Sequence, residues 1–114
     1  MLFLVTSESK VPPSMPMEEI TPKLRETWEL LGRWEKEGKI VGGGRVAGTH
    51  MAYFVANVTS TEELDRLITS SPMYDYMDVE VLPLVSISGA LEQLTEWEQH
   101  RSQQGGQQGR WPSS

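Results

Sequence analysis

The sequence predicts an α+β fold, with its elements in the split βαβ order of ferredoxin-like folds and one further helix at the C-terminal end. Three observations carry this prediction: a short apolar run at the start, large apolar residues at helical spacing, and two strand-like segments that meet at Gly48-Thr49. In this order the strands form a four-stranded antiparallel sheet with two helices on one face. We expect a second copy of the chain, the terminal helix or a ligand to cover the other face.

The first strand is expected at Leu2–Ser9, a short segment rich in apolar and β-capable residues. Because it begins apolar and ends at polar residues, it suits a largely buried position in the sheet. Residues 10–16 then form a linker, since Pro12, Pro13 and Pro16 have no N–H to donate to a neighbouring strand.

The clearest element is a helix between residues 17 and 38. Large apolar residues follow one another at steps of three or four, which places them on one helix face; they are Ile20, Leu24, Trp28, Leu31 and Trp34. Thr21-Pro22 offers an N-cap followed by proline at the first helical position. We therefore expect the regular helix to begin there, with residues 17–20 as a looser lead-in, and to end at Gly38.

A β-hairpin is expected around Gly48-Thr49. Its first strand, within residues 39–48, contains the triple glycine Gly42–Gly44, for which we expect a bulge or a close approach of the backbone. Its second strand, residues 51–58, alternates cleanly. Met51, Tyr53 and Val55 share one face, and Ala52, Phe54 and Val58 share the other.

The rest of the chain completes the order of elements. Cap candidates and acidic residues at positions 59–63 begin a second helix, which runs to about Ser70 before Ser71-Pro72 ends it. A fourth strand is expected at residues 77–87, and a last helix from Ser88 or Gly89 to residue 101. Residues 102–114 form a low-complexity tail of Gln, Gly and Ser, so one domain is expected over residues 1–101.

The composition limits the kind of function. A chain of 114 residues leaves room for one domain, and its net charge of -6 argues against nucleic acid or an anionic membrane as a partner. Because the chain has no cysteine, disulfides, thiolate nucleophiles and Cys-ligated metals are excluded. No basic segment precedes the apolar run at residues 1–5, so we expect a soluble, cytoplasmic protein without a membrane span.

Several stretches of the sequence together match the pattern of one protein family. They are the opening Met1-Leu2-Phe3, Glu37-Gly38 at the end of the first helix, residues 45–48 (RVAG), Tyr53, and above all residues 72–81 (PMYDYMDVEV). In these stretches the sequence resembles the muconolactone delta-isomerase family, and the resemblance runs without gaps over about residues 1–85.

The resemblance implies a dimeric α+β barrel of ferredoxin-like units, assembled in that family into a decamer, so we expect a homodimer or a larger homo-oligomer. It also implies an isomerase that binds a small-molecule substrate between sheet and helices and moves a double bond in a lactone carboxylate by a proton shift. Such chemistry needs a base, a cation or donors for the carboxylate and the developing enolate, and exclusion of water. It needs neither a cofactor nor a metal.

Two departures from the family pattern change the expected site. Residues 40–44 (IVGGG) stand where the family carries polar and aromatic side chains, so we expect a wider and more apolar pocket. Such a pocket suits a hydrophobic lactone, carboxylate or polyketide-like compound. The family's histidine after Ala-Gly is Thr49 here, and His50 follows; this step reverses the face of a strand, but a hairpin loop can absorb it.

The candidate catalytic residues are Arg45, His50, Tyr53 and Tyr76. Arg45 would bind a substrate carboxylate with its guanidinium fork. His50 would move the proton, because imidazole gains and loses protons readily near neutral pH. Tyr53 or Tyr76 would donate a hydrogen bond to the oxyanion.

Three further residues are expected to bind substrate. Trp28 would form a wall of the pocket, and Gly43 would leave room beside it. Glu26 is the alternative base if its side chain points inward.

The catalytic candidates also have structural interpretations. Arg45 could form an ion pair across the sheet with Asp78 or Glu80, which share a strand face. His50 could simply be solvated at the hairpin, and the tyrosines could pack their rings in the sheet or an interface.

Two other functions fit the same fold. The first is a non-catalytic small-molecule-binding or accessory protein of a biosynthetic or catabolic pathway, which the triple glycine and the displaced histidine favour. The second is a monooxygenase of the same superfamily, cofactor-free because the core offers no clear haem-ligating histidine. Fold alone does not decide between these chemistries.

Overall fold

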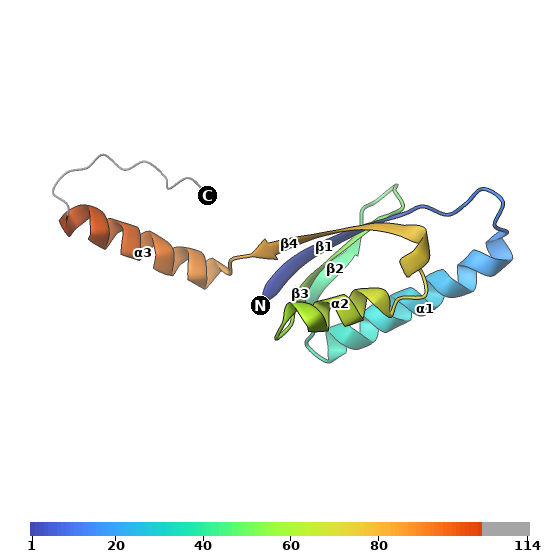
Figure 1. The fold of residues 1–114 in the computed structure, drawn as a ribbon, viewed down its shortest axis with the longest axis horizontal. Coiled ribbons are helices and arrows are strands. Elements are labelled where there is room, and N and C mark those ends of the chain that lie inside the picture. The colour runs from blue at the N-terminus through green and yellow to red at the C-terminus, as the bar shows by residue number, and fades with distance from the viewer. Residues whose placement is uncertain (104–114) are drawn as a thin grey trace. The chain divides into compact units, whose positions relative to one another are not determined.

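The computed structural model describes residues 1–103, and Figure 1 shows the elements that they form. In chain order they are β1 (Leu2–Ser9), α1 (Met17–Lys36), β2 (Ile40–Arg45), β3 (Met51–Asn57), α2 (Thr61–Thr69), a 3-10 turn (Tyr74–Tyr76), β4 (Met77–Leu84) and α3 (Ile87–Gln103). The strands form one antiparallel sheet in the order β2-β3-β1-β4. The predicted α+β class and the split βαβ order are confirmed.

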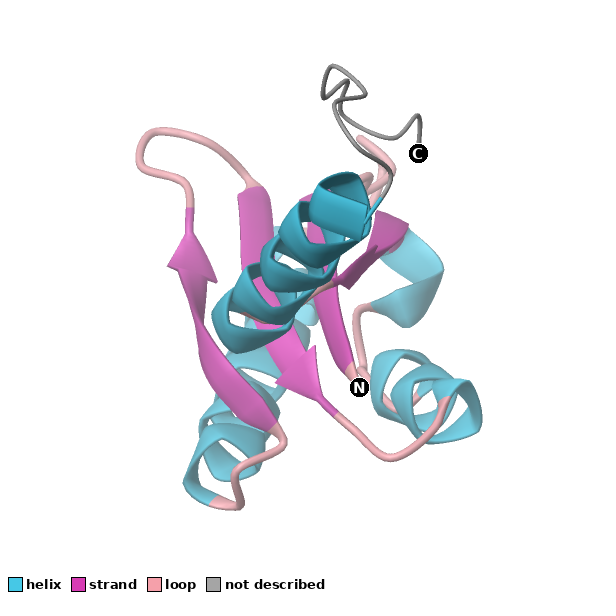
Figure 2. Ribbon diagram, turned by 90° about the vertical axis from the view of Figure 1, so that its left-hand side faces the viewer, coloured by secondary structure: helices cyan, strands magenta, loops and turns pink. Residues whose placement is uncertain are grey.

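The chain divides into two compact units, and the sheet with its helices belongs to the first, residues 1–84. Figure 2 shows the strands side by side as a sheet. Strand β1 lies in its interior, between β3 and β4. Both of its edges are paired, and its start, Leu2–Val5, carries apolar residues on both faces, which suits a strand covered on both faces.

The core lies between one face of the sheet and the helices α1 and α2, which Figure 1 shows on the same side of the strands. Strands and helices both contribute to it: Phe3, Val5, Trp34, Ile40, Ala56, Val58, Leu64 and Leu67. Alternation along each strand therefore decides which side chains reach the helices.

The opposite face of the sheet carries apolar residues at one end. The register places Leu4 between Val55 and Leu82, and Leu2 beside Leu84. Within the described chain Leu82 remains 54% exposed. An apolar patch on one face of a sheet, larger than single scattered residues, is typical of an interaction surface.

Helix α1 begins earlier than predicted. Its first residue is Met17 and Pro22 lies inside it, whereas the sequence placed the start at Thr21-Pro22. The amides of Glu19 and Ile20 already bond to the Pro16 carbonyl, at 3.0 and 3.3 Å. Ile20 is only 3% exposed, so its burial favours the extra turn although Pro22 removes one backbone hydrogen bond. The predicted end is confirmed by Gly38, which has a φ of 80°.

At the triple glycine the sequence suggested a bulge or a close approach of the backbone; the register shift lies immediately before Gly42, and the close approach is at Gly43. Pairing of β2 with β3 shifts between Ile40 and Gly42, so that Gly43 lies opposite Phe54. A Cβ atom on Gly43 would lie 2.5 Å from the carbonyl oxygen of Tyr53, which no side chain tolerates. Glycine is therefore required at this position for the two backbones to approach.

Helix α2 is capped as its sequence predicts. Ser60 accepts a hydrogen bond from the Glu63 amide at 3.1 Å, and the Glu63 carboxylate accepts one from the Thr59 hydroxyl at 2.6 Å. The helix ends at Thr69, before Ser71-Pro72, as expected. The 3-10 turn at Tyr74–Tyr76 was not anticipated, because three residues carry no periodic signal.

The second unit begins at Val85 and contains α3. The predicted last helix is confirmed, although it begins at Ile87 rather than at Ser88 or Gly89. Ile87 and Leu91 are 91% and 63% exposed. Most of the tail predicted at residues 102–114 lies outside the described residues. Within residues 1–103 no helix is both long and apolar enough to cross a bilayer.

Candidate functional site

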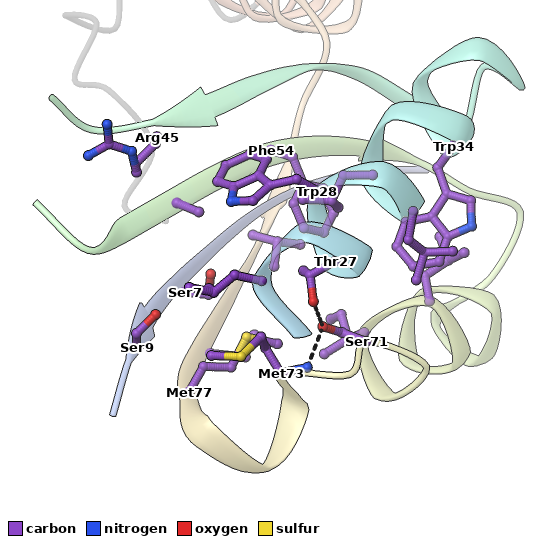
Figure 3. A pocket seen from close by; sticks show the side chains of 18 of the residues that line it. Ser7, Ser9, Thr27, Trp28, Trp34, Arg45, Phe54, Ser71, Met73 and Met77 are labelled. Atoms are coloured by element: carbon purple, nitrogen blue, oxygen red, sulfur yellow. Dashed lines mark hydrogen bonds between the residues drawn. The ribbon is translucent and has the colours of Figure 1, made fainter. Parts of the chain in front are cut away.

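A cavity of about 340 Å³ lies between the helix-facing side of the sheet and the two helices of the first unit. Figure 3 shows its lining, with Arg45 and Ser9 toward one end and Trp34 toward the other. Its lining residues are Val5, Ser7, Ser9, Leu24, Thr27, Trp28, Leu30, Leu31, Trp34, Arg45, His50, Ala52, Phe54, Leu67, Ile68, Ser71, Met73, Met77 and Val79. A concave, mostly apolar space with few polar groups is the usual form of a small-molecule site.

The periodicity of α1 builds one wall of this cavity. Leu24, Thr27, Trp28 and Leu31 all line it, and their spacing of three or four residues places them on one face of the helix. Strands β1 and β3 supply the opposite wall through alternate residues, such as Val5 and Phe54. The same periodicities that build the core therefore also build the pocket.

Among the described residues that line the cavity, Arg45 is the one Lys or Arg. It is the last residue of β2 and pairs with Ala52, which also lines the cavity, so the sheet register brings it to the helix-facing side. Its Nη1 donates to the Thr49 carbonyl at 2.9 Å, which holds the guanidinium beside the hairpin. The group is exposed and its other donors are free of hydrogen bonds within the described residues, so it can bind an incoming carboxylate.

His50 joins Arg45 at the same hairpin. It immediately precedes β3, and its carbonyl accepts from the Ser9 amide at 3.3 Å, which ties the hairpin to β1. Its side chain is exposed although the residue lines the cavity, so it lies at the solvent-facing edge. Among residues 1–103 no Asp or Glu lines the cavity, so His50 is the candidate proton acceptor among the lining residues.

Two hydroxyl groups inside the cavity belong to a directed hydrogen-bond chain. Thr27 Oγ1 donates to the Lys23 carbonyl at 2.8 Å, and the Met73 amide donates to Ser71 Oγ at 3.2 Å. The two hydroxyl oxygens lie 3.2 Å apart. Because each hydroxyl has one proton, Ser71 must be the donor to Thr27. Figure 3 shows the Ser71 contacts as dashed lines. Neither group has a proton left for a substrate oxyanion.

The structure brings together three of the seven residues singled out in the sequence. Arg45, His50 and Trp28 all line the main cavity. Gly43 and Tyr53 line a smaller, second cavity of about 170 Å³, which Trp28 also borders. The expectation that Gly43 lies beside Trp28 thus applies to this second cavity.

Glu26 and Tyr76 lie outside the main cavity. Glu26 is exposed on α1, since it is two positions from both Leu24 and Trp28 and a helix turns about 200° over that step. Tyr76 belongs to the 3-10 turn, where its backbone amide donates to the Met73 carbonyl at 2.9 Å. Tyr53 pairs with Thr6, and its side chain falls on the face of the sheet away from the helices.

The proposed ion pair of Arg45 with Asp78 or Glu80 does not form. Arg45 is on β2 and the two acids are on β4, which are the opposite edges of the sheet. The registers also place Asp78 and Glu80 on the face that points away from the helices. The positions of these charges in the sequence could not show that Arg45 and the two acids lie on opposite edges of the sheet.

Sequence reasoning missed several polar lining residues. Ser7 and Ser9 share the parity of the buried Val5 along β1, so strict alternation would have identified them. Thr27 could likewise have been found one helix turn from Leu24. Ser71 had no comparable signal, because it lies in the loop after α2.

The comparisons with known proteins point to one family. A family model described as muconolactone delta-isomerase matches residues 1–89. Muconolactone delta-isomerase 1 of Acinetobacter lwoffii is 33% identical over 87 residues, which cover 74% of this chain and 88% of that protein. The muconolactone delta-isomerase of Pseudomonas putida is 33% identical over 81 residues, covering 71% of this chain and 84% of that protein.

Solved structures show the same relationship. The crystal structure of muconolactone isomerase matches with a TM-score of 0.70 and 34% identity, over 75% of this chain and 90% of that one. A 5-chloro-2-hydroxyhydroquinone dehydrochlorinase from Burkholderia phenoliruptrix matches with a TM-score of 0.57 over 74% of this chain and 93% of that one. At 17% identity this second likeness concerns the fold alone.

Proposed function

The chain belongs to the muconolactone delta-isomerase family, and from this premise we propose that it is a cofactor-independent isomerase, which moves a double bond in a small, hydrophobic lactone or carboxylate. The observation that carries the proposal is the position of Arg45 and His50 at the edge of an otherwise largely apolar cavity. An anionic substrate would meet its countercharge and its proton acceptor together, while its carbon skeleton enters the apolar space.

Arg45 would bind the carboxylate of the substrate. A guanidinium presents parallel N–H donors that match the two carboxylate oxygens, and one of its nitrogens is already held by Thr49. The same positive charge would stabilise the enolate, because negative charge spreads onto the substrate oxygens as the C–H bond breaks. Binding and transition-state stabilisation would thus share one residue.

His50 would take the proton from the acidified carbon and return it to the carbon at the far end of the allylic system. The C–H electron pair becomes the new double bond as the old one accepts the returning proton, so no group is lost and nothing is oxidised. The walls of Trp28, Leu31 and Phe54 would keep water from the enolate. Thr27 and Ser71 can only accept hydrogen bonds while their chain is intact, so they would orient a protonated group rather than stabilise the anion.

Deuterium exchange tests this proposal directly. A panel of unsaturated lactones and acids in D₂O would be followed by NMR with the wild type, His50→Ala, Arg45→Ala and the control Glu26→Gln, whose side chain is exposed outside the cavity. We expect deuterium uptake with a shifted double bond in the wild type and the control, and its loss in the His50 variant. Unchanged exchange in His50→Ala would refute the assignment of the base.

A second candidate function is non-catalytic binding, favoured by the exposure of His50 and by the absence of a carboxylate from the cavity lining. It predicts that compounds of the same panel bind, as seen in ligand-observed NMR, while no carbon-bound proton exchanges. The protein would then act as a binding or accessory protein of the pathway.

We also propose that two copies pair through the apolar end of the sheet face opposite the helices. Leu2, Leu4, Val55, Leu82 and Leu84 are neighbours there. A pair of such faces would bury side chains that one copy leaves in water. Sedimentation of Leu82→Glu should show a smaller species than the wild type; equal sedimentation would remove this interface. We propose the cytoplasm as the location, which cell fractionation would test.

A further inference from the structure

The main cavity and the second cavity share one wall. Of the residues that the structure describes, three line both of them: Trp28, Leu31 and Phe54. On the far side of this wall the second cavity is bordered by the glycines of α1 and β2, namely Gly32, Gly43 and Gly44. The two spaces are therefore neighbours separated by three side chains.

Part of the second cavity is left open by Gly32, where a Cβ atom would meet no atom within 4 Å. Gly44 pairs with Tyr53 on the face of the sheet away from the helices, so a side chain at position 44 would not enter the cavity. A larger residue at position 32 would reduce the volume of about 170 Å³ beneath β2. The space lies on the side of Trp28 away from the main cavity.

Of the three shared residues, Trp28 is the one whose removal would open the wall without disturbing the core. Leu31 and Phe54 pack against the buried core cluster. Trp28 does not belong to that group and its side chain is 39% exposed. In Figure 3 its indole lies between Arg45 and Trp34, along the path that a substrate tail would take from the anion site.

We propose that Trp28 is the residue that limits the length of the substrate, by separating the main cavity from the glycine-lined cavity. This inference rests on the proposed function in one respect, since it places the charged end of the ligand at Arg45. Substrates would be lactones or carboxylates whose apolar part fills about 340 Å³. With a small residue at position 28 the tail would continue into the second cavity, which favours longer alkyl or aryl tails.

A chain-length series tests the proposal without any turnover. Calorimetric titration would measure Kd for straight-chain saturated carboxylates from butanoate to dodecanoate, below their micelle concentrations. Each methylene that becomes buried should tighten Kd about fourfold. In the wild type this gain should stop when the main cavity is full, and in Trp28→Ala it should continue to longer chains.

Two control variants isolate the wall. Leu24→Ala enlarges the main cavity only, since Leu24 does not border the second one, and should shift the limit less than Trp28→Ala. Adding Gly32→Leu to Trp28→Ala should refill the second cavity and restore the shorter limit. If Trp28→Ala does not fold, as judged by circular dichroism, Trp28→Val takes its place in both comparisons.

The outcomes separate this inference from the proposed function. The proposal is overturned if the chain length at which Kd stops improving is the same in the wild type and in the folded Trp28 variant. It is also overturned if adding Gly32→Leu fails to restore the shorter chain length. Both results count whether or not the protein isomerises lactones. A shifted limit supports it even if no deuterium exchange is found, in which case only the isomerase proposal fails.

Discussion

Ser71 donates its hydroxyl proton to Thr27 across a distance of 3.2 Å, and this contact joins α1 to the loop that follows α2. This contact is the middle of a series of hydrogen bonds that ends in backbone groups, the Met73 amide at one end and the Lys23 carbonyl at the other. Met73 is only 2% exposed, so its amide would have no easy access to water if Ser71 were lost. The floor of the cavity is therefore held by a polar chain as well as by apolar packing.

Ser71→Ala should destabilise the protein by about 1–2 kcal/mol, because it leaves the Met73 amide without its acceptor. Thr27→Val removes the acceptor of the Ser71 hydroxyl and a second donor to the Lys23 carbonyl, which lies inside α1, and should cost about 1 kcal/mol or less. Since both act on one contact, the double variant should cost less than the sum of the two. Urea unfolding of the four proteins measures this, and strictly additive free energies would mean that the contact between Ser71 and Thr27 contributes nothing to stability.

Arg45→Gln should weaken binding of a carboxylate ligand by about ten- to a hundredfold, because a charge-assisted hydrogen bond contributes about 1.5–3 kcal/mol. The methyl ester of the same ligand lacks the anion and should bind both proteins equally. Calorimetric titration with acid and ester provides the comparison. Equal losses for acid and ester would mean that Arg45 shapes the pocket rather than recognising charge.

Gly43→Ala and Gly44→Ala should differ strongly although the glycines are adjacent. The new Cβ at position 43 would lie 2.5 Å from the Tyr53 oxygen, so β2 must shift, at a cost of about 2 kcal/mol or more. At position 44 it meets nothing within 4 Å, and the change should stay within about 0.5 kcal/mol. Thermal unfolding of the two variants checks the close approach of the backbones at Gly43; similar melting temperatures would contradict it.

Glu63 should make the stability depend on pH. Hydrogen bonds from the hydroxyl and amide of Thr59 hold the pKa of the Glu63 carboxyl below its ordinary value. Because the pKa of Glu63 is lower in the folded state than in the unfolded chain, its ionised carboxylate stabilises the fold fully at pH values above the unfolded-chain pKa. This contribution disappears as the pH falls through the folded-state pKa. Glu63→Gln should therefore be less stable than wild type at neutral pH, with the difference shrinking in acid. Glu62→Gln, in the same turn, is the matched control for denaturant unfolding across this range.

Much of the fold could be predicted because its signals are local. Alternation in Met51–Asn57 and helical spacing from Ile20 to Trp34 each fix which side of an element faces the core. The start of α1 was wrong, because a cap rule applied to Thr21-Pro22 ignores the gain from burying Ile20. Such a gain depends on the tertiary partner, which no local rule contains.

Site residues could be predicted to lie together only where they belong to the same local element. Arg45 and His50 belong to one hairpin, so sequence placed them together, and the structure finds both at the cavity. Tyr76 was singled out for its chemistry and lies outside it, since the 3-10 turn before β4 decides its direction. The contact of Thr27 with Ser71 joins residues 44 positions apart and left no trace in the sequence.

The sheet order has a consequence for how this protein is made. β1 is synthesised before the other strands of this sheet but lies in its interior, and one of its two neighbours is the sheet's last strand in chain order, Met77–Leu84. The amino group of Met1 likewise donates to the Val58 carbonyl, 57 positions away, and this hydrogen bond cannot form before Val58 is synthesised. One edge of this apolar strand thus remains unpaired until nearly the whole unit has been synthesised, and the sheet is completed by distant contacts that form slowly. Nascent chains stopped before residue 77 should therefore need a chaperone to remain soluble, whereas chains released after residue 84 should fold without one.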